Sequence, residues 1–211
     1  MTQLGDSREF VIVIDDDASI RRSLDNLLRS VGLQVQTYVS VEAFEKSDIP
    51  DAAVCLVLDI RMPGMSGLEF QRKLAGSFRP LPIVFLTGHG DIPMTVEAMK
   101  GGAIGFLTKP FRDQDLLEAI RTGIKHDRVQ RFALANVSEI HRRFETLTPR
   151  EREVMAHVVT GRLNKQIAAD LNLSEITIKI CRGQVMRKME ASSLVDLVRM
   201  ADKLKSTARS Q

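Results

Sequence analysis

Short apolar runs alternate with amphipathic stretches along the first 110 residues of the chain. Most of the runs are unbroken and rich in branched residues, as expected for central strands of a parallel sheet. One run alternates polar and apolar residues instead, which suits an edge strand. The runs predict five strands, at Phe10–Ile14, Gln34–Tyr38 (the alternating one), Leu56–Leu58, Ile83–Leu86 and Ile104–Leu107.

The stretches between these runs have the spacing of helices. After the first run, apolar residues recur at helical intervals until Gly32. Before the last run, Asp91 and Pro93 indicate the start of a helix, and Gly101-Gly102 its end. Strands that alternate with helices predict an α/β domain with a doubly wound, five-stranded parallel sheet. The first helical stripe consists of Ile20, Leu24, Leu27, Leu28 and Val31.

Residues 112–145 contain one glycine and no proline, so we expect one long helix there. Its last part, residues 127–145, is predicted to be a helical linker rather than a flexible Gly/Ser tether. The predicted apolar stripe of this helix is Leu116, Leu117, Ile120 and Ile124, roughly continued by Val129, Phe132 and Ala133.

From Thr148 onward the pattern is helical throughout. Thr148-Pro149 with Glu151 predicts a capped helix start, and Gly161 a stop. A short helix is expected over Asn164–Leu171. A tight turn at Asn172-Leu173 leads to a second helix, which Ser174 caps and which runs to about Met189. We expect Ile176, Ile180 and Val185 to face the core. The layout is a helix-turn-helix in a smaller all-α domain, although a purely structural helical bundle is the alternative.

Composition narrows the class of protein. An apolar content of 44% is typical of a globular chain, and no run of about 18 apolar residues exists to span a membrane. The first ten residues lack the features of a secretory signal, and two distant cysteines do not support a disulfide framework, so we expect a cytoplasmic protein. Residues 1–145 carry a net charge of −2 and residues 146–211 a net charge of +5. The basic part suggests a polyanionic partner, although such an excess is often only a solvated surface.

Polar residues stand at the ends of four predicted strands. They are Asp15–Asp17, Asp59, Thr87 and Lys109, and the carboxyl ends of parallel strands meet at the edge where ligands bind. Each has a plainer explanation, because the acidic residues could cap a helix or a turn and the lysine could lie on the surface. Taken together they favour a site. Clustered carboxylates raise a pKa or bind a cation, and hard oxygen ligands at a partly open site favour Mg²⁺.

The motifs VIVIDDD, LVLDIRMPGMSG, FLTGHGD and GFLTKPF together resemble the receiver domain of two-component response regulators, over about residues 9–126. The resemblance implies a receiver domain at residues 1–126 with the flavodoxin-like strand order 2-1-3-4-5. It also implies that Asp59 is the phosphoacceptor, which attacks a phosphohistidine of a sensor histidine kinase. The implied Mg²⁺ ligands are Asp16 directly, Asp15 mainly through water, Asp59, and the backbone carbonyl of Arg61.

The same resemblance assigns roles around the phosphoacceptor. Thr87 is expected to hydrogen-bond the phosphoryl group and Lys109 to pair with it. Phe106 occupies the position of an aromatic switch, where relatives often have tyrosine. The Lys109-Pro110 bond is expected to be cis. Arg61 and His89, beside the pocket, are expected to tune the lifetime of the phosphoryl group.

The motifs TPREREV, NKQIAADLNLSEITIK and RKME resemble the LuxR-type DNA-binding domain, which places that domain at residues 146–211. By family position, Lys179 and Ile180 face bases. Gly183 and Cys181 depart from the family pattern, which leaves the operator sequence open. Three further residues are candidates for phosphate contacts, namely Lys165, Arg182 and Lys188.

With a receiver in front, the whole chain is similar to the FixJ/NarL class of transcription regulators. The class implies a transcription regulator that dimerises on phosphorylation, with a sensor histidine kinase, promoter DNA and RNA polymerase as partners and no membrane attachment. Activation is the commoner behaviour in this class, and the sequence leaves activator or repressor open. In this class the amphipathic segment Ser193–Ala201 pairs two DNA-binding domains, whereas a core helix is the plainer alternative. The helix at 93–100, the fifth strand and the helix at 113–126 tend to form the receiver dimer surface.

Two rival functions remain open. One is a Mg²⁺-dependent phosphatase with an aspartyl nucleophile, although such enzymes usually place a second carboxylate two residues on, where this chain has Arg61. The other is a DNA-binding protein whose first domain senses a small molecule, which a pocket lined by carboxylates disfavours. We therefore predict a regulator that is not an enzyme beyond its own phosphorylation and dephosphorylation.

Overall fold

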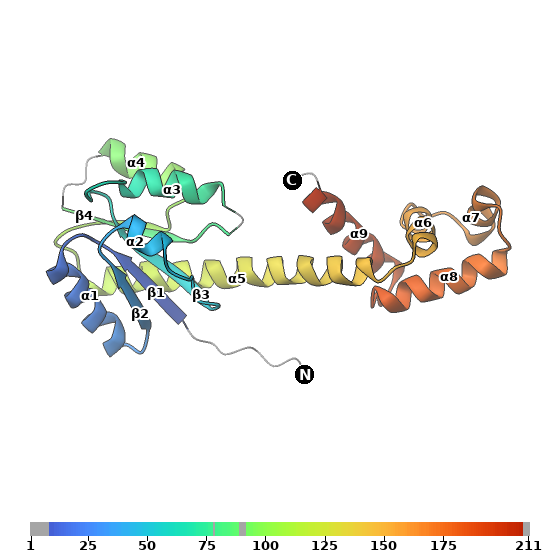
Figure 1. The fold of residues 1–211 in the computed structure, drawn as a ribbon, viewed down its shortest axis with the longest axis horizontal. Helices are drawn as coiled ribbons and strands as arrows, with labels where there is room; N and C mark the ends of the chain where they lie inside the picture. Colours follow the sequence, from blue (N-terminus) through green and yellow to red (C-terminus); the bar gives the residue numbers. More distant parts are fainter. Residues whose placement is uncertain (1–8, 78, 89–91, 209–211) are drawn as a thin grey trace. The chain divides into compact units, whose positions relative to one another are not determined.

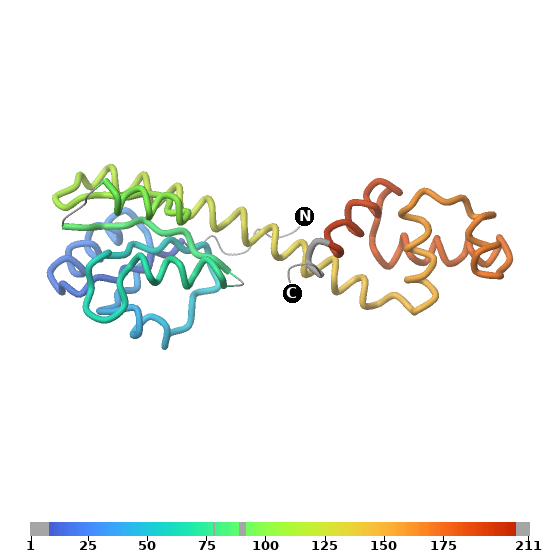
Figure 2. The backbone as a smooth tube through the Cα atoms, turned by 90° about the horizontal axis from the view of Figure 1, so that it is seen from above, coloured from blue at the N-terminus to red at the C-terminus, as the bar shows by residue number. Residues whose placement is uncertain are grey.

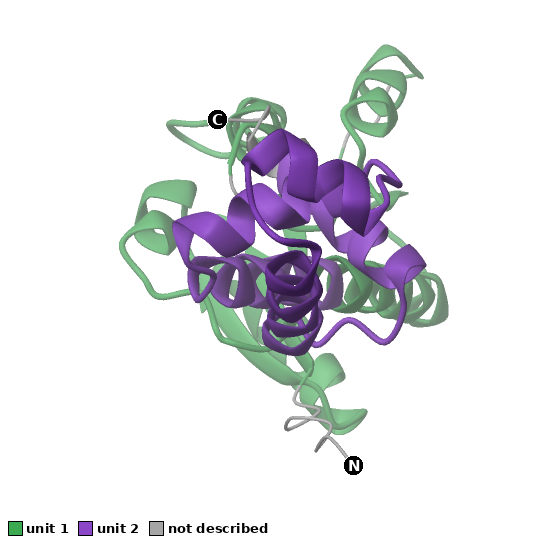
Figure 3. Ribbon diagram, turned by 90° about the vertical axis from the view of Figure 1, so that its right-hand side faces the viewer, with its two compact units in different colours: residues 1–131 green, residues 132–211 purple. Residues whose placement is uncertain are grey.

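The computed structural model describes residues 9–77, 79–88 and 92–208. The chain divides into two compact units, with the boundary between Arg131 and Phe132 (Figure 3). Each unit has its own buried apolar core. The path of the chain through each unit can be followed in Figure 2.

Unit 1 is built on a five-stranded, all-parallel sheet in the order β2-β1-β3-β4-β5 (Figure 1). This confirms the predicted fold class and strand order. Every residue of the third and fourth strands is buried, whereas the second strand alternates and lies at an edge, as its pattern predicted. The strands are β1 (Glu9–Ile14), β2 (Gln34–Tyr38), β3 (Ala53–Asp59), β4 (Ile83–Thr87) and β5 (Gly105–Thr108).

Helices cover both faces of this sheet, because branched side chains alternate between the two faces of each strand. On one face, α1 (Ala18–Ser30) and the first part of α5 (Asp113–Glu145) pack on the sheet. The other face is covered by α2 (Val41–Glu45), α3 (Gly67–Ala75) and α4 (Ile92–Lys100). The proposed cap of the helix before the last strand, Asp91, lies outside the described residues.

The long helix predicted after the sheet is present as α5, which has 33 residues. Ile120 and Ile124 bury in unit 1, and Ile140 buries in unit 2. Val129 and Phe132 are 64% and 75% exposed, so the apolar stripe does not continue through them as we expected. The reason is that the helical face turned toward the sheet is taken by the fully buried Asp127, whose Oδ2 accepts the Val54 N–H at 2.8 Å.

In the part of the chain that the structure describes, unit 2 contains the end of α5 and four more helices, which are α6 (Pro149–Val158), α7 (Asn164–Leu171), α8 (Glu175–Lys188) and α9 (Leu194–Ala208). The predicted caps are formed: Thr148 and Glu151 make a reciprocal capping box, and Ser174 accepts from the N–H of Thr177. Asn172 adopts a left-handed conformation (φ 52°), which makes the tight turn between α7 and α8.

One prediction about α8 was wrong. Ile176 and Ile180, which we expected in the core, are 73% and 60% exposed. The buried side of the helix is instead formed by Ile178, Val185 and Met189, at i, i+7 and i+11. Isoleucines stand at alternate positions, 176, 178 and 180, so the sequence allows either of two sides of the helix to be the buried one. Packing against α6 and α7 decides which side is buried.

Candidate functional site

Three carboxylates converge at one edge of the unit 1 sheet. Asp15 directly follows β1 and Asp59 ends β3, and these strands pair with Ile14 beside Leu58. Asp16 is the next residue along the chain. One carboxylate oxygen from each of Asp15, Asp16 and Asp59 lies within 4.8 Å of the other two. Asp15 and Asp59 are buried, with 1% and 8% of their surfaces exposed, whereas Asp16 is open to solvent.

Lys109 brings an ammonium group into this carboxylate cluster. Its Nζ lies 2.7 Å from Oδ2 of Asp15 and 3.0 Å from Oδ2 of Asp59. The backbone N–H of Lys109 donates to the carbonyl of Thr87 at 2.7 Å, which fixes the ends of β4 and β5 together. The Lys109-Pro110 peptide bond is cis, as the family resemblance predicted. Residues more than 90 positions apart in sequence therefore meet in one hydrogen-bonded group.

The electrostatics of the cluster are unbalanced. Burial raises the pKa of Asp15, and hydrogen bonds from Lys109 and from the N–H of Asp17 offset that effect only in part. Burial by itself lowers the pKa of Lys109, but hydrogen bonds to Asp15 and Asp59 and their negative charges outweigh it, so that this pKa is raised. Three carboxylates thus face one ammonium. An excess of hard oxygen donors of this kind suits Mg²⁺.

Helix capping explains only one of the three consecutive aspartates. Asp17 is the N-cap of α1, because its Oδ1 accepts from the N–H groups of Ser19 at 2.7 Å and Ile20 at 3.4 Å. Asp15 instead accepts the N–H of Asp17 at 2.8 Å and contacts Lys109. The two aspartates that do not cap the helix are therefore the ones that join the cluster.

The remaining residues predicted for the pocket lie around this cluster. Thr87 is fully buried at the end of β4. The N–H of Arg61 donates to Oδ1 of Asp59 at 3.3 Å, while the Arg61 side chain is exposed. Phe106 lies on β5 beside Phe85 and is partly buried against the core under α2, α3 and α4. His89 lies outside the described residues.

Sequence reasoning missed two residues that support the cluster. A Cβ at Gly67 would lie 2.5 Å from the carbonyl oxygen of Asp59, so only glycine allows this close approach. Its position after Ser66, the cap of α3, is a signal that could have been used. Arg21, six residues further along the chain in α1, donates to the carbonyl of Asp15 at 2.7 Å, and one of several arginines on an amphipathic helix gives no such signal.

The five residues predicted to contact DNA fall into two groups. Lys165, Lys179 and Ile180 have exposed side chains, with Lys165 on α7 and the other two on α8. Arg182 and Lys188 instead make contacts inside unit 2. Arg182 donates to Oδ1 of Asn164 at 3.2 Å, and Nζ of Lys188 lies 2.6 Å from Oε2 of the buried Glu151.

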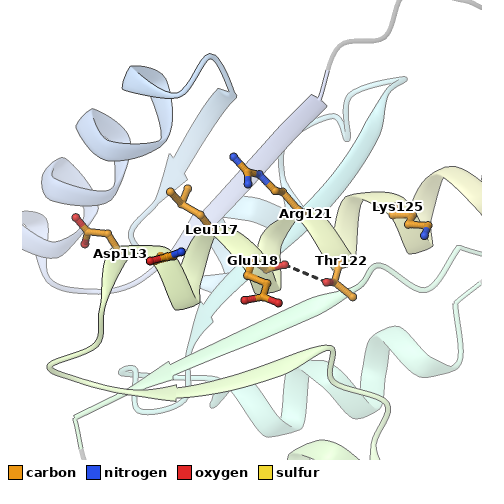
Figure 4. Close-up of a pocket in the computed structure, with 7 residues that line it drawn as sticks. Asp113, Leu117, Glu118, Arg121, Thr122 and Lys125 are labelled. Carbon is orange, nitrogen blue, oxygen red and sulfur yellow. Dashed lines mark hydrogen bonds between the residues drawn. The ribbon is translucent and has the colours of Figure 1, made fainter.

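A separate hollow of about 730 Å³ runs along the exposed side of α5 (Figure 4). All of its lining residues, from Asp113 to Lys125, belong to this helix, and Thr122 Oγ1 donates to the carbonyl of Glu118 at 3.0 Å. It shares no residue with the carboxylate cluster. The polar side chains of the carboxylate cluster therefore converge outside this hollow, in spite of its volume.

Comparisons with known proteins match both units. The family model of the response regulator receiver domain matches residues 11–121, and the model of bacterial regulatory proteins of the luxR family matches residues 145–201. Nodulation protein W of Bradyrhizobium diazoefficiens is 54% identical over 198 residues, which cover 94% of this chain and 87% of that protein. The transcriptional regulatory protein FixJ of Azorhizobium caulinodans is 44% identical over 90% of both chains.

Among solved structures, the low-resolution structure of the response regulator StyR is similar to this chain. The sequence identity is 46% and the TM-score is 0.82, with 93% of this chain and 99% of that chain covered. Within the described residues, no helix is both long enough and apolar enough to cross a membrane.

Proposed function

The chain belongs to the response-regulator family, and we propose that phosphorylation of its receiver domain controls DNA binding by its LuxR-type domain. The matched relatives confirm the predicted resemblance to the FixJ/NarL class and the prediction that the chain is a regulator rather than an enzyme. In this proposal a sensor histidine kinase supplies the phosphoryl group. The regulator acts in the cytoplasm, where it binds promoter DNA as a dimer and activates transcription with RNA polymerase.

The observation that carries the proposal is the excess of carboxylate over ammonium around Asp59. An oxygen of Asp59 attacks the phosphorus of a phosphohistidine, the P–O bond forms as the P–N bond breaks, and the histidine leaves. A carboxylate is a poor nucleophile toward a charged phosphoryl group unless that charge is neutralised. Lys109, already 3.0 Å from Asp59, supplies one positive charge, and Thr87 supplies a hydroxyl at the neighbouring strand end.

The cluster also fits the cation that the family implies. Asp15 and Asp16, with Asp59 and the carbonyl of Arg61, would hold Mg²⁺, consistent with the mutual approach of the three carboxylates. When bound, the ion supplies further neutralisation of charge on the phosphoryl oxygens. The role of this chain is to hold the donors in place, which Arg21 and Gly67 do through the backbone of Asp15 and Asp59.

Phosphorylation adds a charge of about −1.5 to −2 beside Lys109, together with new hydrogen-bond acceptors. We propose that Thr87 moves toward these acceptors and that Phe106, now only partly buried, turns into the space left behind. Such a packing change has two states and favours the dimer. In the DNA-binding domain, Lys179 and Ile180 are proposed to face bases and Lys165 a phosphate. Arg182 and Lys188 were candidates for phosphate contacts, and their contacts within unit 2 leave them less available.

Native mass spectrometry of the full chain, with and without acetyl phosphate and Mg²⁺, tests the chemistry and the assembly together. The expected result is one phosphoryl group per chain and a shift from monomer to dimer. Asp59→Asn should abolish stable phosphorylation, while Asp16→Asn should retain the phosphoacceptor and label more slowly. Undiminished labelling of the Asp59→Asn variant would place the phosphoacceptor elsewhere and refute the proposal.

A further inference from the structure

The exposed side of α8 carries two large apolar side chains that a folded domain would ordinarily bury. Ile176 is 73% exposed and Ile180 is 60% exposed, one helical turn apart. Between them on the same side stands the exposed Lys179. We call Ile176, Lys179 and Ile180 the α8 strip. Single exposed apolar side chains are common, but two isoleucines on adjacent turns beside a lysine form a surface suited to a partner that offers both apolar and anionic groups.

The orientation of the α8 strip is fixed by the rest of unit 2. On the opposite side of the helix, Ile178, Val185 and Met189 are fully buried and prevent rotation about the helix axis. The first turn, which carries Ile176, is held by Ser174, whose Oγ accepts the N–H of Thr177 at 3.1 Å. Because isoleucine is branched at Cβ, its χ1 is also restricted in a helix. The two isoleucines of the strip are therefore held in a fixed orientation.

Beyond the strip, the same side of α8 is open. A Cβ added at Gly183 would meet no atom within 4 Å, so the helix backbone is accessible there. Helix α8 contains one acidic residue, Glu175, against four basic ones, and the sequence from residue 146 onward has a net charge of +5. An occupant of this surface must therefore be negatively charged and approach the backbone closely, while it offers small apolar groups to two isoleucines.

We propose that Ile176 is a specificity-determining residue which, together with Ile180, contacts the C5-methyl groups of thymines in the major groove of the operator. This inference rests on the proposed DNA-binding function and adds to it the base group that the first turn of α8 contacts. The thymine methyl is the apolar group that base edges present in the major groove, and residues near the start of a recognition helix are the ones that reach those edges. Lys179, between the two isoleucines, then faces an adjacent acceptor on a base or a phosphate.

The test removes only the methyl group from the DNA. Duplexes are first selected from a random-sequence library by the full chain activated with beryllofluoride and Mg²⁺. Each thymine of the selected duplex is then replaced by deoxyuridine, and the dissociation constant is measured. Wild type should bind about fourfold more weakly when a contacted methyl is removed. We call this loss of affinity on replacing thymine by deoxyuridine the uracil penalty. Ile176→Ala should bind the original duplex more weakly by a similar factor, and it should lose the uracil penalty at one position in each half-site.

Two matched variants control the measurement. Ile176→Val shortens the side chain by one methyl and should keep part of the uracil penalty. Ile49→Ala truncates another exposed isoleucine, in unit 1, and should leave both affinity and penalty unchanged. Circular dichroism should show that Ile176→Ala folds normally, because its side chain makes little contact with the core.

Several results would overturn the inference. Specific DNA binding with an Ile176→Ala variant that keeps the full uracil penalty would overturn it while leaving the proposed function intact. A variant that binds DNA more tightly without activation and keeps the penalty would also overturn it, because the strip would then serve a protein contact. A library from which no sequence is enriched would refute the DNA-binding function, and this inference with it.

Discussion

The two units each contain a lysine bound to an acidic side chain, but the balance of charge differs. In unit 2, Nζ of Lys188 lies 2.6 Å from Glu151, and the same carboxylate accepts the N–H of Thr148. One ammonium is paired with one carboxylate, and backbone groups supply further hydrogen bonds to the pair. In unit 1, Lys109 meets Asp15 and Asp59, with Asp16 close by. Here three carboxylates lie near one ammonium and near the guanidinium of Arg21, which donates to the carbonyl of Asp15.

This difference separates a structural ion pair from a candidate reactive site. The lysine in unit 2 lowers the pKa of Glu151 and fixes α8 against the start of α6, so the pair stabilises the fold. In unit 1, burial raises the pKa of Asp15 in spite of its hydrogen bond with Lys109, so the fold disfavours the ionised form of this carboxylate. A bound cation would relieve this excess of negative charge, and the cation and Lys109 together could then neutralise charge on a phosphoryl group. Substitutions that change one charge at a time can test this comparison.

The largest effect is expected from Lys109→Met. Loss of the Lys109 ammonium beside Asp59 should slow phosphorylation by acetyl phosphate by roughly 100-fold, because a preorganised charge that stabilises the transition state is removed. The rate is measured by intact-mass spectrometry. The matched control is Arg112→Met, which removes one positive charge from a nearby exposed pair with Asp115 and should leave the rate unchanged. Equal rates for the two variants would contradict the role of Lys109.

Lys188→Met should instead act on stability. It leaves the carboxylate of Glu151, which is 9% exposed, without its cation, and we expect unit 2 to lose about 2 kcal/mol of unfolding free energy. Hydrogen exchange of peptides from α6 and α8 should then be about 30-fold faster. Lys179→Met, on the exposed side of the same helix, should leave exchange unchanged and weaken DNA binding. Loss of DNA binding without faster exchange in the Lys188 variant would make Lys188 a DNA contact.

The smallest effect is expected from Asp15→Asn, which should raise stability, whereas Lys188→Met should lower it. Removing this buried negative charge should slightly raise the free energy of unfolding of unit 1 in EDTA, because burial disfavours the ionised form of Asp15. Because the pKa of Asp15 is raised in the fold, the wild type loses stability as the pH rises from the usual value of 3.8 through the raised value. The advantage of the variant should therefore grow over that range and then level off. Urea denaturation followed by the single tyrosine, Tyr38 in unit 1, measures it.

Asp16→Asn is the control for this experiment, because Asp16 is exposed and its removal should change stability little in EDTA. Both variants should bind Mg²⁺ more weakly than the wild type. An Asp15→Asn variant that is less stable than the wild type in EDTA would contradict the view that the cluster carries excess charge.

Some features followed from the sequence because they depend on neighbours along the chain. Unbroken branched runs identified β3 and β4, and Thr148, Glu151 and Ser174 identified helix starts. The approach of Asp15, Asp59 and Lys109 also followed, since parallel strands present their carboxyl ends at one edge of a sheet. These predictions held because local hydrogen bonding and sheet geometry leave few alternatives.

The sequence by itself determined the five strands, the long helix α5, the helices of unit 2 and which side chains gather at the sheet edge, but it specified neither α2 nor α3. Only the tertiary structure decided which face of α8 is buried, that Asp127 rather than Val129 turns toward the sheet, and that Lys188 pairs with Glu151. The physical reason is that periodicity fixes the spacing of side chains along an element, whereas its rotation depends on what packs against it. A lysine looks the same in the sequence whether its partner is a buried carboxylate or water.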